Sequence, residues 1–177
     1  MSSFDFESYI VDIPDYPKPG VIFKDITPLL GDPVAFPAAI NDIAAHFEDA
    51  GVTKVVGAEA RGFMIGAPVA YRLGAGFVPA RKPGKLPRET FSQSYALEYG
   101  TDSLEVHQDA FDENDVVLIV DDLVATGGTA EAQIKLIEQT GAQVAGLGFL
   151  MELEFLHPRD LISKVSDVEM YSLIKVS

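Results

Sequence analysis

Residues 116–130, VVLIVDDLVATGGTA, decide the fold class of this chain. The segment opens with five apolar, largely β-branched residues, a run typical of a buried strand. Asp121 and Asp122 follow where the apolar run stops, and a glycine-rich turn then precedes a helical pattern. A strand, an acid pair, a glycine turn and a helix start therefore lie together, as they do in α/β proteins with parallel sheets.

Each part of this segment favours one end of a ligand. Glycines let consecutive backbone N–H groups point into one concavity, and the following helix adds its positive N-terminal end, so a phosphate fits there. The acid pair suits hydroxyl groups or a metal ion. A ribose 5-phosphate combines both features, whereas the plainer interpretation is a glycine-rich turn with solvated acids. The residues predicted to bind it are Asp121, Asp122, Ala125, Thr126, Gly127, Gly128 and Thr129.

Common nucleotide-binding motifs do not compete with this interpretation. The chain has no G-x-x-x-x-G-K-[ST] sequence, and its two G-x-G spacings, at 74/76 and 146/148, lack the third glycine of a dinucleotide fingerprint. The segment instead resembles the phosphoribosyl diphosphate (PRPP) signature of type I phosphoribosyltransferases.

Composition narrows the function classes. The 177 residues predict one domain, and 47% hydrophobic with 23% charged residues is ordinary globular composition. A formal charge of −14 disfavours binding to nucleic acid or to an anionic membrane. The chain shows no secretory signal pattern, no long apolar run and no cysteine, so we expect a cytoplasmic setting. The three histidines have no ligand spacing, which leaves carboxylate-bound Mg²⁺ as the possible metal.

The remaining pattern predicts strands alternating with helices. A helix beginning at Asp32 or Pro33 is expected to end near Gly51, and Pro68 counts against a long helix over the segment that ends at residue 73. Alternation predicts a single domain over 1–177 with a mainly parallel sheet flanked by helices. Residues 1–30 then form a hood over the site, and the hairpin forms a lid. The predicted strands are 54–58, 77–80, 95–99 with 103–107 as the hairpin, 116–120, 144–151 and 170–176, and the last helix is 130–140.

Two further segments carry positive charge at predicted strand ends. Arg81, Lys82, Lys85 and Arg88 fall within eight residues that contain no acid, which suggests a polyanion pocket in so acidic a chain. Arg61, in EARG, offers a second place for a pyrophosphate. The plainer interpretations are a solvated basic loop and a turn with a surface arginine. With the acid and glycine segment, both would surround the groups that make up PRPP.

Five motifs along the chain, taken together, are more specific than any one of them. PKPGVIFKDITPLL, EARGF, RKPGKLP, LEYG with a following LEVH, and VDDLVATGGT are similar, in order and across nearly the whole chain, to those of the adenine phosphoribosyltransferase family. The resemblance implies the type I phosphoribosyltransferase fold and transfer of the phosphoribosyl group of PRPP to adenine. The products would be AMP and pyrophosphate, in purine salvage. It also implies Mg²⁺ held mainly by PRPP, a cytoplasmic homodimer, and no nucleic-acid or membrane partner.

The same resemblance implies roles for individual residues. Adenine would lie between Phe23 and Leu153, with backbone groups around Ile22 and Arg61 reading its edge. Glu98 would be the acid/base for the purine nitrogens, next to Tyr99 on the lid. Phe23 and Leu153 are otherwise ordinary core residues, and a strand glutamate is otherwise a solvated one. The implied catalytic residues are Glu98, Arg61 and Lys82, and Arg81 and Lys85 would bind the pyrophosphate side.

Two alternatives remain open. VDDLVATGGT reports only the phosphoribosyl end of the ligand, so a transferase for a 6-oxopurine or for orotate fits it equally well, although LEYG and PGVIFKDI favour adenine. A PRPP-sensing regulator of transcription would need a DNA-binding module, and the chain offers neither spare length nor a basic helix.

Overall fold

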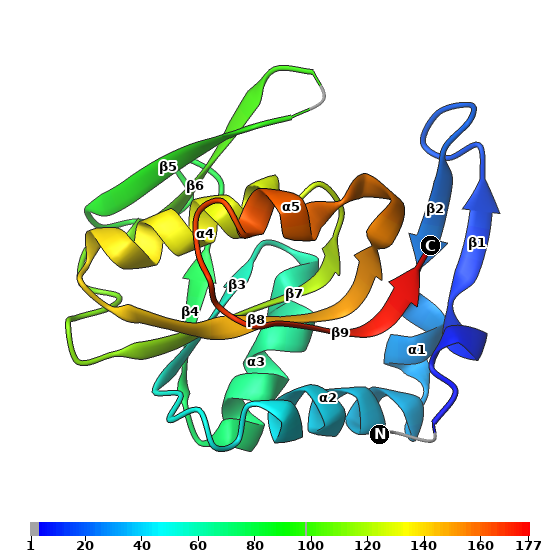
Figure 1. The fold of residues 1–177 in the computed structure, drawn as a ribbon, viewed down its shortest axis with the longest axis horizontal. Coiled ribbons are helices and arrows are strands. Elements are labelled where there is room, and N and C mark those ends of the chain that lie inside the picture. The colour runs from blue at the N-terminus through cyan, green and yellow to red at the C-terminus, as the bar shows by residue number, and fades with distance from the viewer. Residues whose placement is uncertain (1–3, 98) are drawn as a thin grey trace.

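A five-stranded parallel sheet forms the centre of the protein (Figure 1). The computed structural model describes residues 4–97 and 99–177. The sheet has the order β4-β3-β7-β8-β9, so the chain moves outward from β3 to β4 and then returns to the other side of β3. Its strands are β3 (Lys54–Ala58), β4 (Gly76–Ala80), β7 (Val116–Val124), β8 (Gln143–Leu153) and β9 (Met170–Val176).

Alternation along β7 divides the interior into two layers. Val117 and Ile119 belong to the core beneath α4 (Gly128–Gln139), whereas Leu118 and Val120 belong to the core that α2 (Ala35–His46) and α3 (Arg61–Leu73) cover. Successive side chains of a strand point to opposite faces of the sheet, so a continuous apolar run is buried on both sides. Figure 1 shows α2 and α3 on one face and α4 with α5 (Pro158–Ile162) on the other.

Two antiparallel hairpins stand outside this sheet. Near the N-terminus, β1 (Val11–Pro14) pairs with β2 (Ile22–Asp25), and in mid-chain β5 (Thr90–Ala96) pairs with β6 (Thr101–His107). The short elements are η1 (Glu7–Tyr9), α1 (Thr27–Gly31) and η2 (Glu154–Leu156). None of the helices in the described part of the chain is long and apolar enough to span a bilayer.

The predicted fold class is confirmed, and β3 and β9 have the predicted bounds. Three local predictions are wrong. Pairing of β7 with β8 continues to Val124, so the acid pair lies inside the strand and not after it. Pro68 sits within the 13-residue helix α3, because the buried face of that helix outweighs one lost backbone hydrogen bond. Ala96 pairs with Thr101, which places Tyr99 in the turn of the hairpin and not in its first strand.

The helix predicted to begin at Asp32 or Pro33 begins slightly later. The Asp32 carboxylate accepts hydrogen bonds from the backbone N–H groups of Val34 and Ala35, at 2.9 and 2.8 Å, and α2 starts at Ala35. Asp32 therefore satisfies donors that the first turn leaves free. The sequence analysis predicts no helix for the preceding element, α1.

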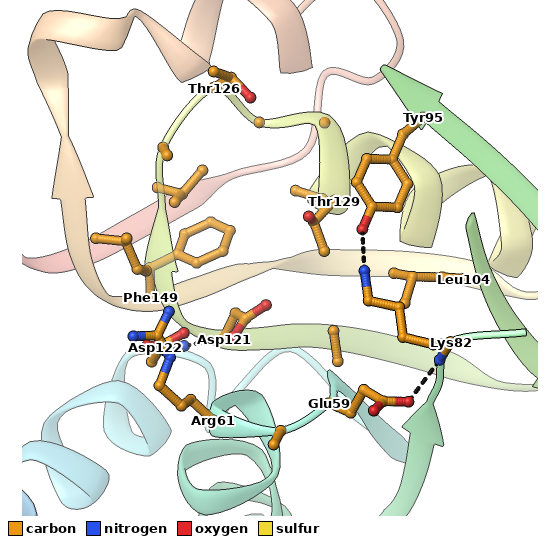
Figure 2. A pocket seen from close by; sticks show the side chains of 18 residues that line it. Glu59, Arg61, Lys82, Tyr95, Leu104, Asp121, Asp122, Thr126, Thr129 and Phe149 are labelled. Atoms are coloured by element: carbon orange, nitrogen blue, oxygen red, sulfur yellow. Dashed lines mark hydrogen bonds and ion pairs between the residues drawn. The ribbon is translucent and has the colours of Figure 1, made fainter. Parts of the chain in front are cut away.

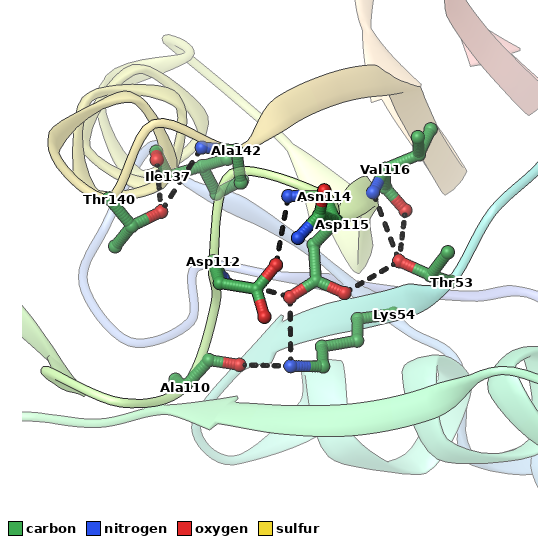
Figure 3. A network of polar contacts seen from close by, with 10 residues as sticks. All are labelled: Thr53, Lys54, Ala110, Asp112, Asn114, Asp115, Val116, Ile137, Thr140 and Ala142. Atoms are coloured by element: carbon green, nitrogen blue, oxygen red, sulfur yellow. Dashed lines mark hydrogen bonds and ion pairs between the residues drawn. The ribbon is translucent and has the colours of Figure 1, made fainter.

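A polar network fixes the beginning of β7 (Figure 3). The Asp115 carboxylate lies 2.9 Å from Lys54 Nζ and accepts hydrogen bonds from the Thr53 hydroxyl and the Asp112 backbone N–H, at 2.8 and 2.9 Å. Burial alone would raise the pKa of Asp115, but these bonds outweigh it and hold that pKa below its usual range. The network ties β3 to β7 at the amino-terminal ends of these strands, opposite the ends near the acid pair.

Candidate functional site

A cavity of about 270 Å³ opens at the carboxyl ends of β3 and β7 (Figure 2). The connection after β3 leads through α3 to β4 on one side, and the connection after β7 leads through α4 to β8 on the other side. The two connections therefore diverge and leave a crevice between the ends of β3 and β7. The residues that line it are Ala58 to Arg61, Lys82, Tyr95, Leu104, Asp121 to Ala130 and Phe149.

The glycine turn forms one wall of this cavity. Gly127 has a φ of +94°, a backbone conformation that side chains with a Cβ rarely adopt, and Gly128 begins α4. A Cβ at Gly128 would lie 3.2 Å from the Ala96 carbonyl oxygen, so the hairpin of β5 and β6 comes close to the turn. Thr126 and Thr129 flank the turn, as Figure 2 shows. The wall thus combines free backbone donors with the positive end of a helix, which favours a phosphate.

The acid pair forms the floor of the cavity. Residues Asp121 and Asp122 are 9% and 4% exposed, and the Asp122 backbone N–H donates to Asp121 Oδ1 at 2.8 Å. Burial, and then the neighbouring charge of Asp122, raise the pKa of Asp121 well above its usual range.

Arg61 provides the positive charge beside this pair. Its Nε lies 2.9 Å from Asp122 Oδ2, yet no donor from residues 4–97 or 99–177 hydrogen-bonds to that buried oxygen. The distance defines an ion pair, while the orientation leaves Asp122 Oδ2 available to another donor. A hydroxyl group of a ligand is such a donor.

Glu59, at the end of β3, organises the basic loop. Its carboxylate accepts hydrogen bonds from the Lys82 backbone N–H and from Lys85 Nζ, both at 2.6 Å, and Arg81 Nε lies 3.4 Å away. Burial alone would raise the pKa of Glu59, but Lys85 and Lys82 outweigh it and lower that pKa. The peptide bond between Glu59 and Ala60 is cis. Glu59 therefore gathers three residues of the basic loop at the rim of the cavity.

Lys82 extends into the cavity toward the hairpin. Its Nζ donates to the Tyr95 hydroxyl at 3.0 Å, which Figure 2 shows, and forms a close ion pair with Asp102 of β6. Burial alone would lower the pKa of Lys82, but the bonds to Asp102 and Tyr95 outweigh it and raise that pKa. Lys82 is therefore a charged group inside the cavity.

The structure brings together nine of the predicted site residues as cavity lining: Arg61, Lys82, Asp121, Asp122, Ala125, Thr126, Gly127, Gly128 and Thr129. Arg81 and Lys85 lie behind them on Glu59. Among described residues, Ile22, Phe23, Leu153 and Tyr99 do not line the cavity. The predicted acid/base Glu98 lies outside the described residues.

The residues predicted on the adenine side lie outside the cavity lining, each in different surroundings. Phe23 is next to the cavity, because the Arg61 guanidinium carbon lies 5.6 Å from its ring centroid. Ile22 is 59% exposed, and Leu153 packs half-buried against the core. Tyr99 lies with its ring centroid 5.2 Å from Lys18 Nζ of the N-terminal hairpin turn.

Sequence reasoning missed Glu59, Tyr95 and Asp102. Glu59 stands in the same four-residue segment as Arg61, so its place at a strand end was a usable signal. Tyr95 and Asp102 carry no such signal, since only the pairing of β5 with β6 places them together.

Comparison with known proteins agrees with this site. Residues 34–171 match the family model of the phosphoribosyl transferase domain. Over 175 residues the chain is 55% identical to the adenine phosphoribosyltransferase of Desulfitobacterium hafniense, covering 99% of both chains. The crystal structure of adenine phosphoribosyltransferase from Thermoanaerobacter pseudethanolicus has a TM-score of 0.91 at 53% identity, covering 97% of this chain and 98% of that one. The enzyme from Giardia lamblia, complexed with 9-deazaadenine, has a TM-score of 0.93 at 38% identity, covering 100% and 99%.

The parallel sheet, the glycine turn at α4 and the buried acid pair define a phosphoribosyltransferase of type I fold. Within that class the chain belongs to the adenine phosphoribosyltransferases.

Proposed function

We propose that the cavity transfers the 5-phosphoribosyl group of PRPP to adenine, giving AMP and pyrophosphate for purine salvage. The observation that carries this proposal is the meeting of a phosphate-type helix terminus, a buried carboxylate pair and two cations in one cavity. Family membership over nearly the full chain supports the same activity.

PRPP would lie along the wall formed by the ends of β3, β4 and β7. The turn Ala125 to Thr129 would bind the 5′-phosphate, and Asp121 and Asp122 would accept hydrogen bonds from the ribose hydroxyls. Asp122 Oδ2 is suited to this because it is buried and lacks a hydrogen-bond donor from the described chain. Arg61 and Lys82 would then face the pyrophosphate, with Arg81 and Lys85 adding positive charge behind them.

The reaction itself explains why charge must gather here. Displacement at the anomeric carbon by a purine nitrogen passes through a state with oxocarbenium character, and negative charge builds up on the departing pyrophosphate. Arg61 and Lys82 would stabilise that charge, because both are positioned before the reaction begins. Their preorganisation lowers the barrier more than mobile ions in water would.

Mg²⁺ fits this site as an ion that PRPP carries. Within residues 4–97 and 99–177, no group of three or more His, Asp or Glu side chains has the arrangement of a metal site. The oxygen-rich floor at Asp121 and Asp122 nevertheless suits a hard cation held mainly by the substrate. When bound, the ion would neutralise the pyrophosphate oxygens and assist their departure.

The adenine side is proposed from the family resemblance. Adenine would lie between Phe23 and Leu153, with backbone groups around Ile22 and Arg61 reading its edge. The contact of Phe23 with Arg61 supports this, because it places the aromatic ring beside the cavity. We also propose that residues 1–30 form a hood within a single domain spanning 1–177.

The hairpin of β5 and β6 would close the site. Its proximity to the α4 turn supports this role, since the Ala96 carbonyl lies against Gly128. A closed lid keeps water from hydrolysing PRPP. Glu98 and Tyr99 would then bring the acid/base to the purine only when the site is shut. A homodimer and a cytoplasmic location stay predictions from the family resemblance.

One experiment tests the activity and its specificity together. The purified chain is incubated with PRPP and Mg²⁺ and with adenine, hypoxanthine, guanine or orotate in turn, and pyrophosphate release is measured. A 6-oxo base presents an acceptor where adenine presents a donor, so discrimination on the order of 10⁴ is expected. Comparable turnover of hypoxanthine would refute the adenine assignment, and absence of turnover with every base would refute the transferase.

A further inference from the structure

Each cation predicted to face the pyrophosphate already has a carboxylate partner. Arg61 pairs with Asp122, and both Arg81 and Lys85 pair with Glu59. These two carboxylates belong to β7 and to the end of β3, so they are fixed parts of the main sheet. Each of these three positive charges therefore has an ion-pair partner before any substrate binds, although Arg81 and Lys85 share one carboxylate.

Lys82 differs from the others in the origin of its partner. Asp102 lies on β6, in the hairpin that we propose closes the site. It pairs with Tyr95, one position before the last pair of the hairpin, Ala96 with Thr101. The Asp102 carboxylate is held in place by the Ser103 backbone N–H, which donates to Oδ1 at 2.8 Å, and by the Tyr95 hydroxyl, 3.4 Å from Oδ2. Lys82 is thus bound by two hairpin side chains on the cavity side.

The ion pair is accessible enough to be exchanged. The side chains of Lys82 and Asp102 are 36% and 31% exposed, whereas Glu59 and Asp122 are 10% and 6% exposed. Half-exposed ion pairs contribute little net free energy, so a multiply charged ligand displaces such a partner readily. Of the pairs at this wall, Lys82 with Asp102 is the one most open to exchange.

We propose that Asp102 is a positioning residue that competes with the pyrophosphate of PRPP for Lys82. This inference rests on the proposed function. In the free protein Asp102 holds the ammonium group inside the cavity and ties the outer part of the hairpin to it. When PRPP binds, Lys82 turns to the pyrophosphate and Asp102 is released, so substrate binding and the position of the hairpin are coupled through one ion pair.

The geometry of the hairpin limits how far this release extends. At its base, Arg81 and Glu105 exchange backbone hydrogen bonds of 2.9 and 2.7 Å, which fix β6 to the end of β4. Asp102 lies three residues further toward the tip. Release of Lys82 therefore frees the tip while the base stays anchored.

The test measures the affinity of Mg²⁺–PRPP by calorimetry for the wild type, Asp102→Asn, Lys82→Met and the double variant. Removal of the competitor should tighten PRPP binding about three- to tenfold in Asp102→Asn. The gain should disappear in the Lys82→Met background. Asp102→Ser serves as a second variant with a smaller side chain, and the expected result for it is the same.

Asp109→Asn is the matched control for net charge. Asp109 forms an exposed ion pair with Arg88 just after β6, so its removal takes away one negative charge without touching the cavity. Its PRPP affinity should stay within about 1.5-fold of the wild type. Steady-state kinetics should show a lower KM for PRPP in Asp102→Asn and an unchanged KM for adenine, a split that general loosening of the fold does not produce.

Unchanged or weaker PRPP binding in both Asp102 variants would overturn the proposal. So would a gain that persists in the Lys82→Met background, or an equal gain in Asp109→Asn. A wild type that binds no PRPP would instead refute the proposed function, which keeps the two failures distinct.

Discussion

Gly62→Ala should displace Asp121 without replacing any residue that we propose contacts the substrate. Gly62 lies in the first turn of α3, and a Cβ there would be 2.9 Å from Asp121 Oδ1. Ordinary contact begins near 3.4 Å, so the carboxylate must move by about 0.5 Å. Asp121 is buried and hydrogen-bonded to the Asp122 backbone, which leaves it little room to move elsewhere.

The expected cost follows from these distances. Misplacement of a substrate-binding group by 1 Å can lower kcat/KM about 10²-fold, so half that displacement should lower it about tenfold. Overpacking costs about 1 to 3 kcal/mol in the free energy of unfolding, and alanine in a helix recovers about 1 kcal/mol relative to glycine. The net loss of stability should therefore be about 0 to 2 kcal/mol.

Gly66→Ala is the matched control, one turn further along α3. A Cβ at Gly66 would lie 2.9 Å from Phe77 Cε2, so it meets a comparable steric conflict away from the cavity. Urea unfolding should show similar stabilities for the two variants, while pyrophosphate release at varied PRPP should show the tenfold loss only in Gly62→Ala. Wild-type kcat/KM in folded Gly62→Ala, or an equal loss in Gly66→Ala, would refute the argument that Asp121 must keep its position.

Three further predictions concern individual carboxylates. Replacing Asp121 and Asp122 together by Asn should lower kcat/KM well over tenfold, since each lost charge-assisted hydrogen bond is worth about 1.5 to 3 kcal/mol; a folded double variant with near-normal kinetics would remove the pair from the site. Glu98→Gln, which cannot take up a proton, should reduce kcat about 10²- to 10⁴-fold while PRPP still binds in calorimetry, and an unchanged kcat would contradict the acid/base role. Asp115→Asn should lower the free energy of unfolding by about 1 to 3 kcal/mol at pH 7. The folded-state pKa of Asp115 is depressed, so its contribution to stability is present above the unfolded pKa near 4 and is lost as the pH falls through the folded pKa. In urea unfolding at decreasing pH, the free energies of unfolding of the wild type and of Asp115→Asn should therefore converge. A difference between them that persists in acid would rule this out.

The order and type of the main elements could be predicted because their signals are local. Five apolar residues after position 115 predict a buried strand, and the glycines at 127 and 128 predict a turn before a helix. The end of β7 could not be predicted in this way. Two acids interrupt its apolar run, and the residues from Asp121 to Val124 belong to the strand because β8 pairs with them. Pro68 shows the same limit, since the packing of α3 overrides a local rule.

The same distinction between local signals and tertiary pairing applies to the candidate site. The sequence by itself determined which segments carry phosphate-binding, acidic and basic residues, because glycine turns and clustered charges are visible in the order of residues. Only the tertiary structure decided which charge meets which: Lys82 with Asp102, Glu59 with Lys85, and Arg61 with Asp122. The physical reason is that the partner of a charge depends on strand order and register, which bring together residues far apart in the chain, whereas propensity and pattern act only over neighbouring residues.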